Sequence, residues 1–422
     1  MTAAHATQCA IAGGGPAGMM LGLLLARAGV AVTVLEKHAD FLRDFRGDTI
    51  HPSTLEVMHE LGMLDEFLRL PHQKVPRLTA QFGSEGLAIA DFSRLPVRCR
   101  YVAMMPQWEF LNFLASHAAS HPTFRLLMLA EVTDIVERDG RVAGLRASLP
   151  EGPIELSAEL VVGADGRTSV VRERAGLSVR DLGAPMDVLW FRLSRSAHDP
   201  ADTMGRFEAG RIFIAINRGD YWQCGYVIPK GSIEAIRARG LSSFRADVAD
   251  AAPFARDRVG ELADWDAVKL LTVRVDRLRR WWREGLLCIG DAAHAMSPVG
   301  GVGINLAIQD AVATANLLVE PLRAGRVEAR DLERVQRRRE LPTRVTQRLQ
   351  LLVQNRLVTR ALGNSRPFKA PAVLRLLARA PLLRRLPARI VGLGVRPEHV
   401  AATLRAPGLG TSPEPIGGSA RP

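Results

Sequence analysis

Apolar residues at the start of the chain change their spacing in a regular order. Cys9-Ala-Ile-Ala is short and continuous, as in a buried strand, and the apolar stretch that follows it to Ala26 has the length of a helix. Gly29 ends this stretch, and Val30-Ala-Val-Thr-Val-Leu-Glu36 has the β-branched composition of a second strand. This order predicts a parallel strand–helix–strand unit.

Glycines occupy the turn between the first strand and the helix, in the pattern GxGxxG. Gly13 allows a tight turn, Gly15 lets a pyrophosphate approach backbone N–H groups at the helix start, and Gly18 permits close helix–strand packing. Glu36 ends the second strand, where a carboxylate can accept hydrogen bonds from a ribose. The pattern therefore predicts a dinucleotide site, with a glycine-rich turn that binds no ligand as the alternative.

The next region mixes helical and alternating patterns. Ser53-Thr-Leu-Glu56 has the spacing of a capping box and predicts a helix that ends at Gly62. Residues 78–104 alternate apolar and polar positions, as strands do, and a helix is predicted from Gln107. A hairpin is predicted at Arg138-Asp-Gly-Arg141.

Two later segments repeat the order of strand, turn and helix start. Residues 160–172 combine an apolar strand with an Asp165-Gly turn. In residues 286–310 an apolar run leads to Asp291, to a loop with three more glycines, and to an amphipathic stretch from Ile304. The second glycine cluster thus lies far along the chain from the first.

Residues 186–275 have a different character. Short strands are predicted at 188–193, 211–216 and 221–228, separated by Gly/Asp turns, and a helical stretch covers 232–250. This pattern predicts an antiparallel α+β module inserted in the chain.

Positive charge is concentrated at the C-terminal end. The net charge is +12, but from Arg323 onward 20 Arg and one Lys face six acidic residues, so the first 322 residues carry about −3. The segment is helical and rich in Arg and Leu, with prolines at several points, and we expect it to pack against the main body. Because the excess lies in one segment, it gives little support to a nucleic-acid partner.

Cysteine usage and the N-terminus indicate a cytoplasmic protein. Cys9, Cys99, Cys224 and Cys288 lie far apart with no CxxC pair, which argues against disulfides and a zinc site. The N-terminal residues have no signal-peptide pattern, and arginine and glycine interrupt the apolar stretch 17–35. We expect no membrane segment, no bound metal, and a monomer or homodimer.

Three motifs occur in one order: Gly13-Gly-Gly-Pro-Ala-Gly18 with Glu36, Val162-Gly-Ala-Asp-Gly-Arg167, and Gly290-Asp-Ala-Ala-His-Ala-Met-Ser-Pro298. Together they resemble the single-component (class A) FAD-dependent aromatic monooxygenases of the para-hydroxybenzoate hydroxylase type. The resemblance covers roughly residues 8–320. It implies an α/β fold with a Rossmann-like FAD-binding domain of the glutathione-reductase type, interleaved with an α+β substrate domain that carries an antiparallel sheet, plus C-terminal helices.

Domain boundaries follow from the resemblance and the changes of pattern. We predict a FAD-binding domain that covers 5–75, 105–180 and 276–322, and a substrate domain that covers 76–104 and 181–275. A helical segment covers 323–408, and a disordered tail covers 409–422.

The resemblance also implies a role for particular residues of the first two motifs. Glu36 would hold the adenosine ribose, and Arg46 and Gln107 would contact the ribityl and phosphate region. Asp165 would support FAD and touch the nicotinamide cofactor's pyrophosphate. The alternative for Arg46 is a surface arginine, for Gln107 a helix cap, and for Asp165 a simple turn residue.

The third motif would lie at the reactive end of the cofactor. Asp291 would bond the ribityl chain, Pro298 would lie beside flavin and substrate, and the backbone of Gly303 to Asn305 would meet the pyrimidine edge. His294 is expected to be structural. The complete set of candidate cofactor contacts is Gly13, Gly15, Pro16, Ala17, Gly18, Glu36, Lys37, Arg46, Gln107, Val132, Asp165, Asp291, Pro298, Gly303, Ile304 and Asn305.

Substrate contacts are expected on the antiparallel module of residues 186–275. By alternation, Trp190 and Arg192 share one face of their strand, and Tyr221 and Gln223 share one face of theirs. If one face of this sheet covers the flavin, these four residues and Pro298 are candidate pocket residues, and a solvent-facing or interdomain position is the alternative.

The implied reaction uses FAD, NADPH or NADH, and O₂ to hydroxylate an aromatic or polyketide-like small molecule through a flavin C4a-hydroperoxide. A helix N-terminus near the flavin would stabilise the reduced, anionic ring by about 1–2 kcal/mol. A reductase that inserts no oxygen and a non-catalytic FAD-binding protein are the alternatives. A halogenase is disfavoured, because Cys224 and Tyr226 stand where it would have two tryptophans.

Overall fold

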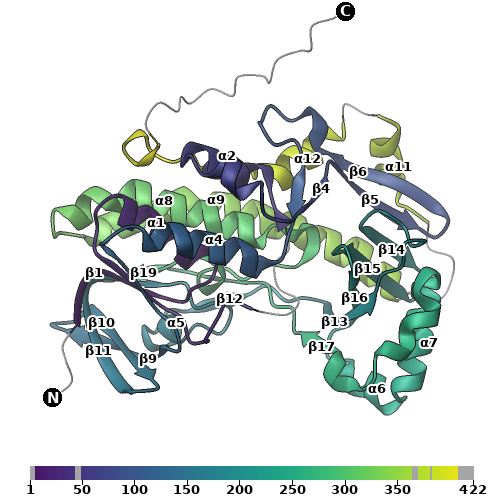
Figure 1. Cartoon of the computed structure of the whole chain (residues 1–422), viewed down its shortest axis with the longest axis horizontal. Coiled ribbons are helices and arrows are strands. Elements are labelled where there is room, and N and C mark those ends of the chain that lie inside the picture. The colour runs from purple at the N-terminus through teal and green to yellow at the C-terminus, as the bar shows by residue number, and fades with distance from the viewer. Residues whose placement is uncertain (1–4, 43–48, 364–368, 381–382, 407–422) are drawn as a thin grey trace, which may run out of the picture.

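Two large sheets and a layer of long helices form the molecule. The computed structural model describes residues 5–42, 49–363, 369–380 and 383–406 (Figure 1). Arg46 and the predicted tail 409–422 lie outside these residues.

The first sheet has eight strands and is parallel at its centre. Its path runs β19-β20-β11-β1-β2-β8, and β10 and then β9 continue antiparallel from the long strand β11. The bounds are β1 His5–Ala12, β2 Val32–Leu35, β8 Phe124–Leu127, β9 Glu131–Arg138, β10 Arg141–Leu149, β11 Gly152–Gly163, β19 Trp282–Arg283 and β20 Leu286–Cys288. In the parallel centre β1 pairs with both β2 and β11, and β20 is placed beside β11. Three separate stretches of the chain therefore contribute strands to this sheet.

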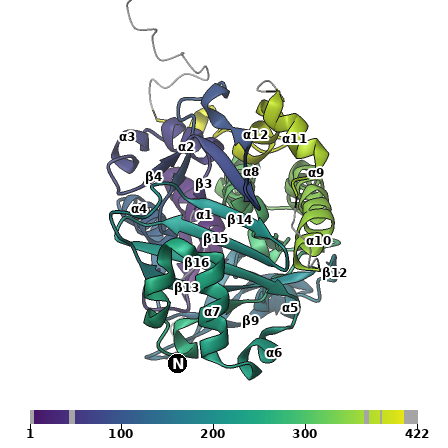
Figure 2. The ribbon, with the colours of Figure 1, turned by 90° about the vertical axis from the view of Figure 1, so that its right-hand side faces the viewer.

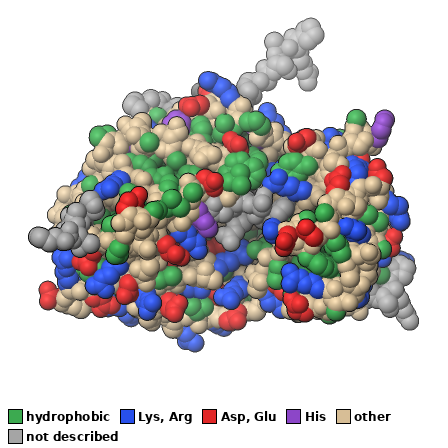
Figure 3. All heavy atoms as spheres, turned by 60° about the horizontal axis from the view of Figure 1, so that its bottom comes forward, with side chains coloured by type: hydrophobic (Ala, Val, Ile, Leu, Met, Phe, Trp, Pro, Cys, Tyr) green, Lys and Arg blue, Asp and Glu red, His purple; other side chains and the backbone are tan. Residues whose placement is uncertain are grey.

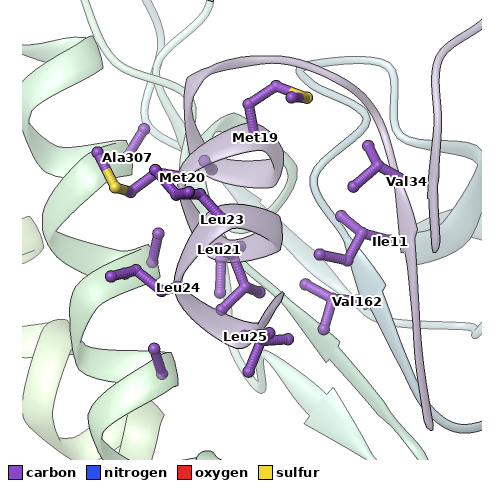
Figure 4. Close-up of a cluster of buried hydrophobic side chains, with 14 of the residues drawn as sticks. Ile11, Met19, Met20, Leu21, Leu23, Leu24, Leu25, Val34, Val162 and Ala307 are labelled. Carbon is purple, nitrogen blue, oxygen red and sulfur yellow. The ribbon is translucent and has the colours of Figure 1, made fainter. Parts of the chain in front are cut away.

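Four long helices form a layer over this sheet (Figure 1). They are α1 Pro16–Arg27, α4 Gln107–Ala119, α8 Gly303–Arg323 and α9 Ala329–Val353. In Figure 4, Met20 and Leu24 of α1 point toward the helix that carries Ala307, whereas Ile11 and Val162 project from the strands on the other side. All five side chains are buried, so α1 is packed on two opposite sides.

Among the described residues, one helical stretch has the length and apolar character of a membrane span. It is Val299–Arg323, which includes α8, and 83% of its apolar window is buried inside the molecule. Burial of this kind is typical of a core helix.

The second sheet has seven strands in the order β17-β13-β16-β15-β14-β5-β6. The bounds are β5 Arg77–Phe82, β6 Glu85–Asp91, β13 Met186–Ser194, β14 Met204–Glu208, β15 Arg211–Asn217, β16 Tyr221–Pro229 and β17 Lys269–Leu271. All neighbours are antiparallel except β14 and β5. The helices α6 Ile233–Ala238 and α7 Leu241–Ala251 follow β16, and α7 lies over one face of the sheet (Figure 2).

Smaller elements connect the two sheets. A three-stranded sheet joins β3 Thr49–Ile50, β7 Val102–Met104 and β4 Gln73–Val75, and a two-stranded ribbon joins β12 Val179–Asp181 and β18 Asp276–Leu278. The short helices are α2 Pro52–Glu60, α3 Leu64–Phe67 and α5 Val170–Arg174. Tight 3₁₀ turns occur at Phe92–Arg94, Pro253–Glu261, Trp265–Ala267, Gly290–Ala292, Val299–Gly301 and Ala402–Leu404.

The C-terminal helices pack against the rest of the molecule. After α9, a π-helical turn Gln354–Val358 leads to α10 Thr359–Leu362, α11 Ala372–Arg379 and α12 Arg385–Gly392. The helices α11 and α12 lie on β6 (Figure 1). Helix α10 packs against β15. Within the described part of the Arg-rich segment, α10, α11 and α12 therefore cover the second sheet, whereas α9 packs on α8 and β19.

The predicted capping box at Ser53 is wrong. Helix α2 begins at Pro52, with His51 as its N-cap and no side-chain cap. Proline at the first helical position places Ser53 inside the first turn. Its hydroxyl donates instead to the Asn305 side chain, and Glu56 accepts from the Arg98 N–H.

Candidate flavin and substrate site

Backbone atoms crowd two glycines of the first turn, Gly13 and Gly18. Gly13 has φ +102°, and a Cβ there would lie 2.4 Å from the Ala164 carbonyl oxygen. A Cβ on Gly18 would lie 2.0 Å from the Gly13 carbonyl oxygen, so the start of α1 can approach β1 only without a side chain. Around Gly15, in contrast, no atom of the described residues lies within 4 Å of an added Cβ. The turn thus leaves open space at the N-terminus of α1, which has no side-chain cap.

Glu36 holds the end of β2 against this turn. One carboxylate oxygen accepts from the Gly14 N–H at 3.0 Å and the other from the His38 N–H at 3.1 Å. Lys37 beside it is exposed, while the Val132 side chain is buried in the core. Gln107 is the first residue of α4, after the N-cap Pro106, so the helix-cap alternative does not apply.

The side chain of Asp165 is used within its own loop. Its carboxylate accepts from the Ser169 hydroxyl at 2.5 Å and from the Val171 N–H at 3.1 Å. Ser169 is in turn the N-cap of α5, so the carboxylate braces the start of that helix. Burial raises the pKa of Asp165, although these hydrogen bonds oppose the shift. Both oxygens are occupied, which favours the turn-forming alternative for this side chain.

The second and third motifs are joined by an ion pair. Arg167 Nε donates to Asp291 Oδ2 at 3.0 Å, and both side chains are about one-third exposed. The buried Arg172 donates to the Ala292 carbonyl at 3.3 Å. The Asp-Gly-Arg loop is thus tied to the Gly-Asp turn, and Asp291 has a protein partner that the resemblance did not imply.

The third motif also meets the first. A Cβ on Gly290 would lie 3.1 Å from the Cβ of Ala17 in α1 and 3.5 Å from that of Ala307 in α8. Since Gly13 touches Ala164, all three motifs meet at the start of α1. Segments far apart in the sequence therefore share one opening.

Distant strands hold the second glycine cluster. The Gly301 carbonyl accepts from Thr49 Oγ1 at 2.7 Å and is bonded by His51 Nε2 at 3.1 Å. Gly301 has φ +63°, and a Cβ would lie 2.6 Å from Thr49 Oγ1. Burial lowers the pKa of His51 to about 4, so its ring is neutral at pH 7.

The N-terminus of α8 resembles that of α1 in its open surroundings. In the part of the chain that the structure describes, no atom lies within 4 Å of a Cβ added to Gly303, and α8 has no side-chain cap. Asn305 is buried, and its Oδ1 accepts from the Ser53 and Thr54 hydroxyls at 2.5 and 3.1 Å. Its Nδ2 has no hydrogen-bond partner among the described residues. Open space at two helix starts and an unsatisfied buried donor fit a bound FAD.

His294 has a structural environment. Its Nε2 lies 2.6 Å from Asp310 Oδ2, its ring packs on Trp281, and Asp310 also accepts from Arg339. Burial opposes ionisation of Asp310, but His294 and Arg339 outweigh it and lower the pKa of that carboxyl. The buried network agrees with the expected structural role of His294.

The substrate candidates lie on the sheet face opposite α7. Register places Arg192 across from Gln223 and Trp190 across from Gly225, and directly opposed residues share a face. The Trp190 ring lies over Gly225, where a Cβ would meet it at 3.0 Å. Leu189 and the other alternate residues of β13 face the core beneath α7.

This face turns toward the third motif. Trp190 belongs to the same apolar cluster as Met104, and Val299, next to Pro298, packs against that cluster. The Arg192 guanidinium lies 4.8 Å from the Tyr221 ring centroid. Trp190 therefore lies on the face of the second sheet whose apolar cluster is contacted by Val299, next to Pro298.

Sequence reasoning missed one polar residue beside these candidates. Arg218 donates through Nε and Nη2 to Gln223 Oε1, both at 3.1 Å, and Gln223 is buried. Arg218 lies in the turn before β16, directly ahead of Gly219-Asp220 in the sequence. That position does not predict a contact with Gln223.

Comparison with known proteins agrees with the geometry. A family model described as "FAD binding domain" matches residues 6–349. The chain belongs to this family. It is similar to a 6-methylpretetramide 4-monooxygenase of Streptomyces rimosus, with 34% identity over 91% of this chain and 92% of that protein. A rifampicin monooxygenase of Streptomyces venezuelae is 31% identical over 71% of this chain, which spans only 61% of that protein.

Solved structures share the fold. An anhydrotetracycline hydroxylase of Streptomyces rimosus has a TM-score of 0.73 and 24% identity, covering 93% of this chain and 77% of that one. A p-nitrophenol 4-monooxygenase of Pseudomonas putida also has a TM-score of 0.73, with 21% identity, covering 91% and 97%.

These findings confirm the fold class and the family resemblance. The chain is an FAD-dependent monooxygenase of the class A aromatic hydroxylase type, with FAD as its cofactor. The reductase and non-catalytic alternatives lose support, because the relatives named above are monooxygenases.

Proposed function

We propose that the enzyme hydroxylates an aromatic, polyketide-like small molecule, with NADPH or NADH and O₂ as co-substrates. The observation that carries this proposal is the meeting of three motifs at the start of α1, with the Trp190 face of the second sheet beside the third motif. The named substrates of the relatives, a pretetramide and rifampicin, support the substrate class.

The two helix starts would divide the cofactor between them. Gly15 and the first turn of α1 would bind the pyrophosphate through backbone N–H groups. Gly303 and Ile304 at the start of α8 would lie at the flavin ring, and Asn305 Nδ2 would donate to it. FAD, when bound, accepts electrons from the nicotinamide cofactor and transfers oxygen from O₂ to the substrate ring.

The remaining candidates keep narrower proposed roles. Arg46 and Gln107 would contact the ribityl and phosphate region, and Asp291 would reach the ribityl chain from its ion pair with Arg167. Asp165 would act by shaping its loop.

Substrate would lie between Pro298 and the second sheet. Trp190 would offer an aromatic wall, and Arg192, Tyr221 and Gln223 would offer polar contacts at one end of it. NAD(P)H would bind transiently, because no second GxGxxG motif follows a strand.

Location and assembly are further proposals. We expect a cytoplasmic enzyme that acts as a monomer or homodimer and needs no nucleic acid. On the face drawn in Figure 3, described Lys and Arg side chains are mixed with Asp and Glu rather than gathered in one basic surface.

Oxygen labelling tests the proposal. Purified enzyme with bound FAD is given NADPH or NADH, ¹⁸O₂ and a panel of phenolic polyketides. We expect a product that gains one ¹⁸O atom. A protein that neither carries nor takes up FAD, or one that oxidises NAD(P)H to form only unlabelled products, would contradict it.

A further inference from the structure

Three buried glutamines lie along one side of α9 and its continuation. Gln347, Gln350 and Gln354 are spaced by three and four residues, which places them on one helix face. A buried amide is costly unless its hydrogen bonds are made. All three amides face one stretch of the third motif, residues 295–299.

Gln350 bonds both sides of Pro298. Its Oε1 accepts from the Ser297 N–H at 3.2 Å, and its Nε2 donates to the carbonyls of Ser297 and Val299, both at 2.9 Å. One side chain therefore satisfies three backbone groups around a residue that has no N–H of its own.

The other two glutamines extend this contact. Gln347 Nε2 donates to the Ala295 carbonyl at 3.1 Å, and Gln354 Nε2 donates to the Ser297 hydroxyl oxygen at 2.7 Å. That hydroxyl oxygen also accepts from the Val299 N–H at 3.2 Å. The segment is thus held at three successive points along the helix.

Packing alone does not explain these residues. Methionine or leucine would fill similar space without the cost of burying an amide. An amide offers a donor and an acceptor together, so it can fix the position of a backbone segment as well as cover it.

We infer that Gln350, assisted by Gln347 and Gln354, is a positioning residue that sets where Pro298 and Val299 lie between the flavin and the substrate. The inference rests on the proposed function. It makes α9 part of the active-site framework, because its glutamines act through the backbone of the segment that carries Pro298.

Gln350→Met tests the inference, with Gln336→Met as the matched control. Gln336 lies on the same helix and also bonds backbone, at Trp281 N–H and the Arg279 carbonyl, away from Pro298. We expect both variants to lose thermal stability, and Gln350→Met to lose more, because Gln350 is buried and makes three backbone bonds whereas Gln336 is partly exposed and makes two. Only Gln350→Met should change the visible spectrum of bound FAD and raise the ratio of hydrogen peroxide to product, by about tenfold, because small misplacement near the reacting atoms is costly.

Two further variants keep the test decisive. Ser297→Ala removes the Gln354 contact and the bond from the Val299 N–H without altering the helix, but it keeps the three Gln350 bonds, so it should give a smaller change of the same kind. In Gln350→Glu, the protonated carboxyl can both donate and accept, whereas the ionised form would repel two carbonyls. Its flavin spectrum should approach that of the wild type as pH falls.

The outcomes separate this inference from the proposed function. If Gln350→Met matches Gln336→Met in flavin spectrum and peroxide ratio, or if Gln350→Glu shows no dependence on pH, the inference is wrong. If the wild-type protein binds no FAD, the proposed function fails first.

Discussion

The two glycine-rich turns precede α1 and α8, which both contact Gly290, but they are held in different ways. The turn at Gly13–Gly18 is closed by backbone contacts with β1 and with the end of β11. The turn at Gly300–Gly303 depends on side chains from distant elements, such as Thr49, His51 and Gln350. The first turn is held mainly by close backbone packing, whereas the second depends on side-chain hydrogen bonds and can be shifted by substitutions far away in the sequence.

Truncation should have the largest effect and should act through the second turn. Removing residues 365–422 deletes Glu398, a buried partner of the fully buried Arg339, and Leu393, whose carbonyl accepts from Gln309 of α8. We expect the free energy of unfolding to fall by about 3–5 kcal/mol or more, since one broken buried pair costs that much. Chemical unfolding and flavin content measure this.

A chain ending at Ala406 is the control for that truncation, because it keeps these contacts. Equal stability and flavin content in the two shortened chains would show that the C-terminal helices are peripheral.

Gly18→Ala should break the first turn. Its Cβ would lie 2.0 Å from a backbone oxygen, so we expect a loss of about 3 kcal/mol and of bound flavin. Gly86→Ala is the control, since no atom lies within 4 Å of its added Cβ. A Gly18→Ala protein with normal flavin content would refute the backbone account of this turn.

Acid should loosen the second turn through His51. Its pKa is about 4 in the folded chain, below the ordinary 6.5, so the unfolded chain binds the proton more readily between these values. Stability should therefore fall as pH drops from 6.5 to 4, by up to about 1.4 kcal/mol per pH unit. His51→Gln should flatten this dependence in urea titrations, and an unchanged slope would exclude His51 as its source.

The smallest effect is expected at the ion pair between the second and third motifs. Arg167 and Asp291 are each about one-third exposed. Arg167→Gln should lower stability by less than about 1 kcal/mol. A much larger loss in thermal unfolding would mean that this pair, rather than the glycine contacts, holds the motifs together.

Local pattern was enough to predict the first turn and most strands. The order of strand, glycine turn and helix at residues 9–36 is encoded by neighbouring residues, and the observed β1, α1 and β2 match it. The strand β14 was missed, because its five residues include glycine and two charged side chains.

Tertiary contacts explain what the sequence did not reveal. Ser53 has the spacing of a cap but bonds Asn305, 252 positions away, which no local rule anticipates. The spacing of Gln347, Gln350 and Gln354 predicts a shared helix face, but not which segment lies opposite. The second turn is therefore less predictable than the first for the same reason that it is more sensitive to distant changes.

We propose that the first turn seats the pyrophosphate of FAD and that the second seats its ring. Titration of apoprotein with FAD, using the Gly15→Ala and Gly303→Ala variants, tests this assignment. Both added methyl groups enter open space, so both variants should fold. We expect Gly15→Ala to weaken FAD binding without shifting the visible spectrum, and Gly303→Ala to shift the spectrum. Wild-type affinity and spectrum in both variants would contradict the claim.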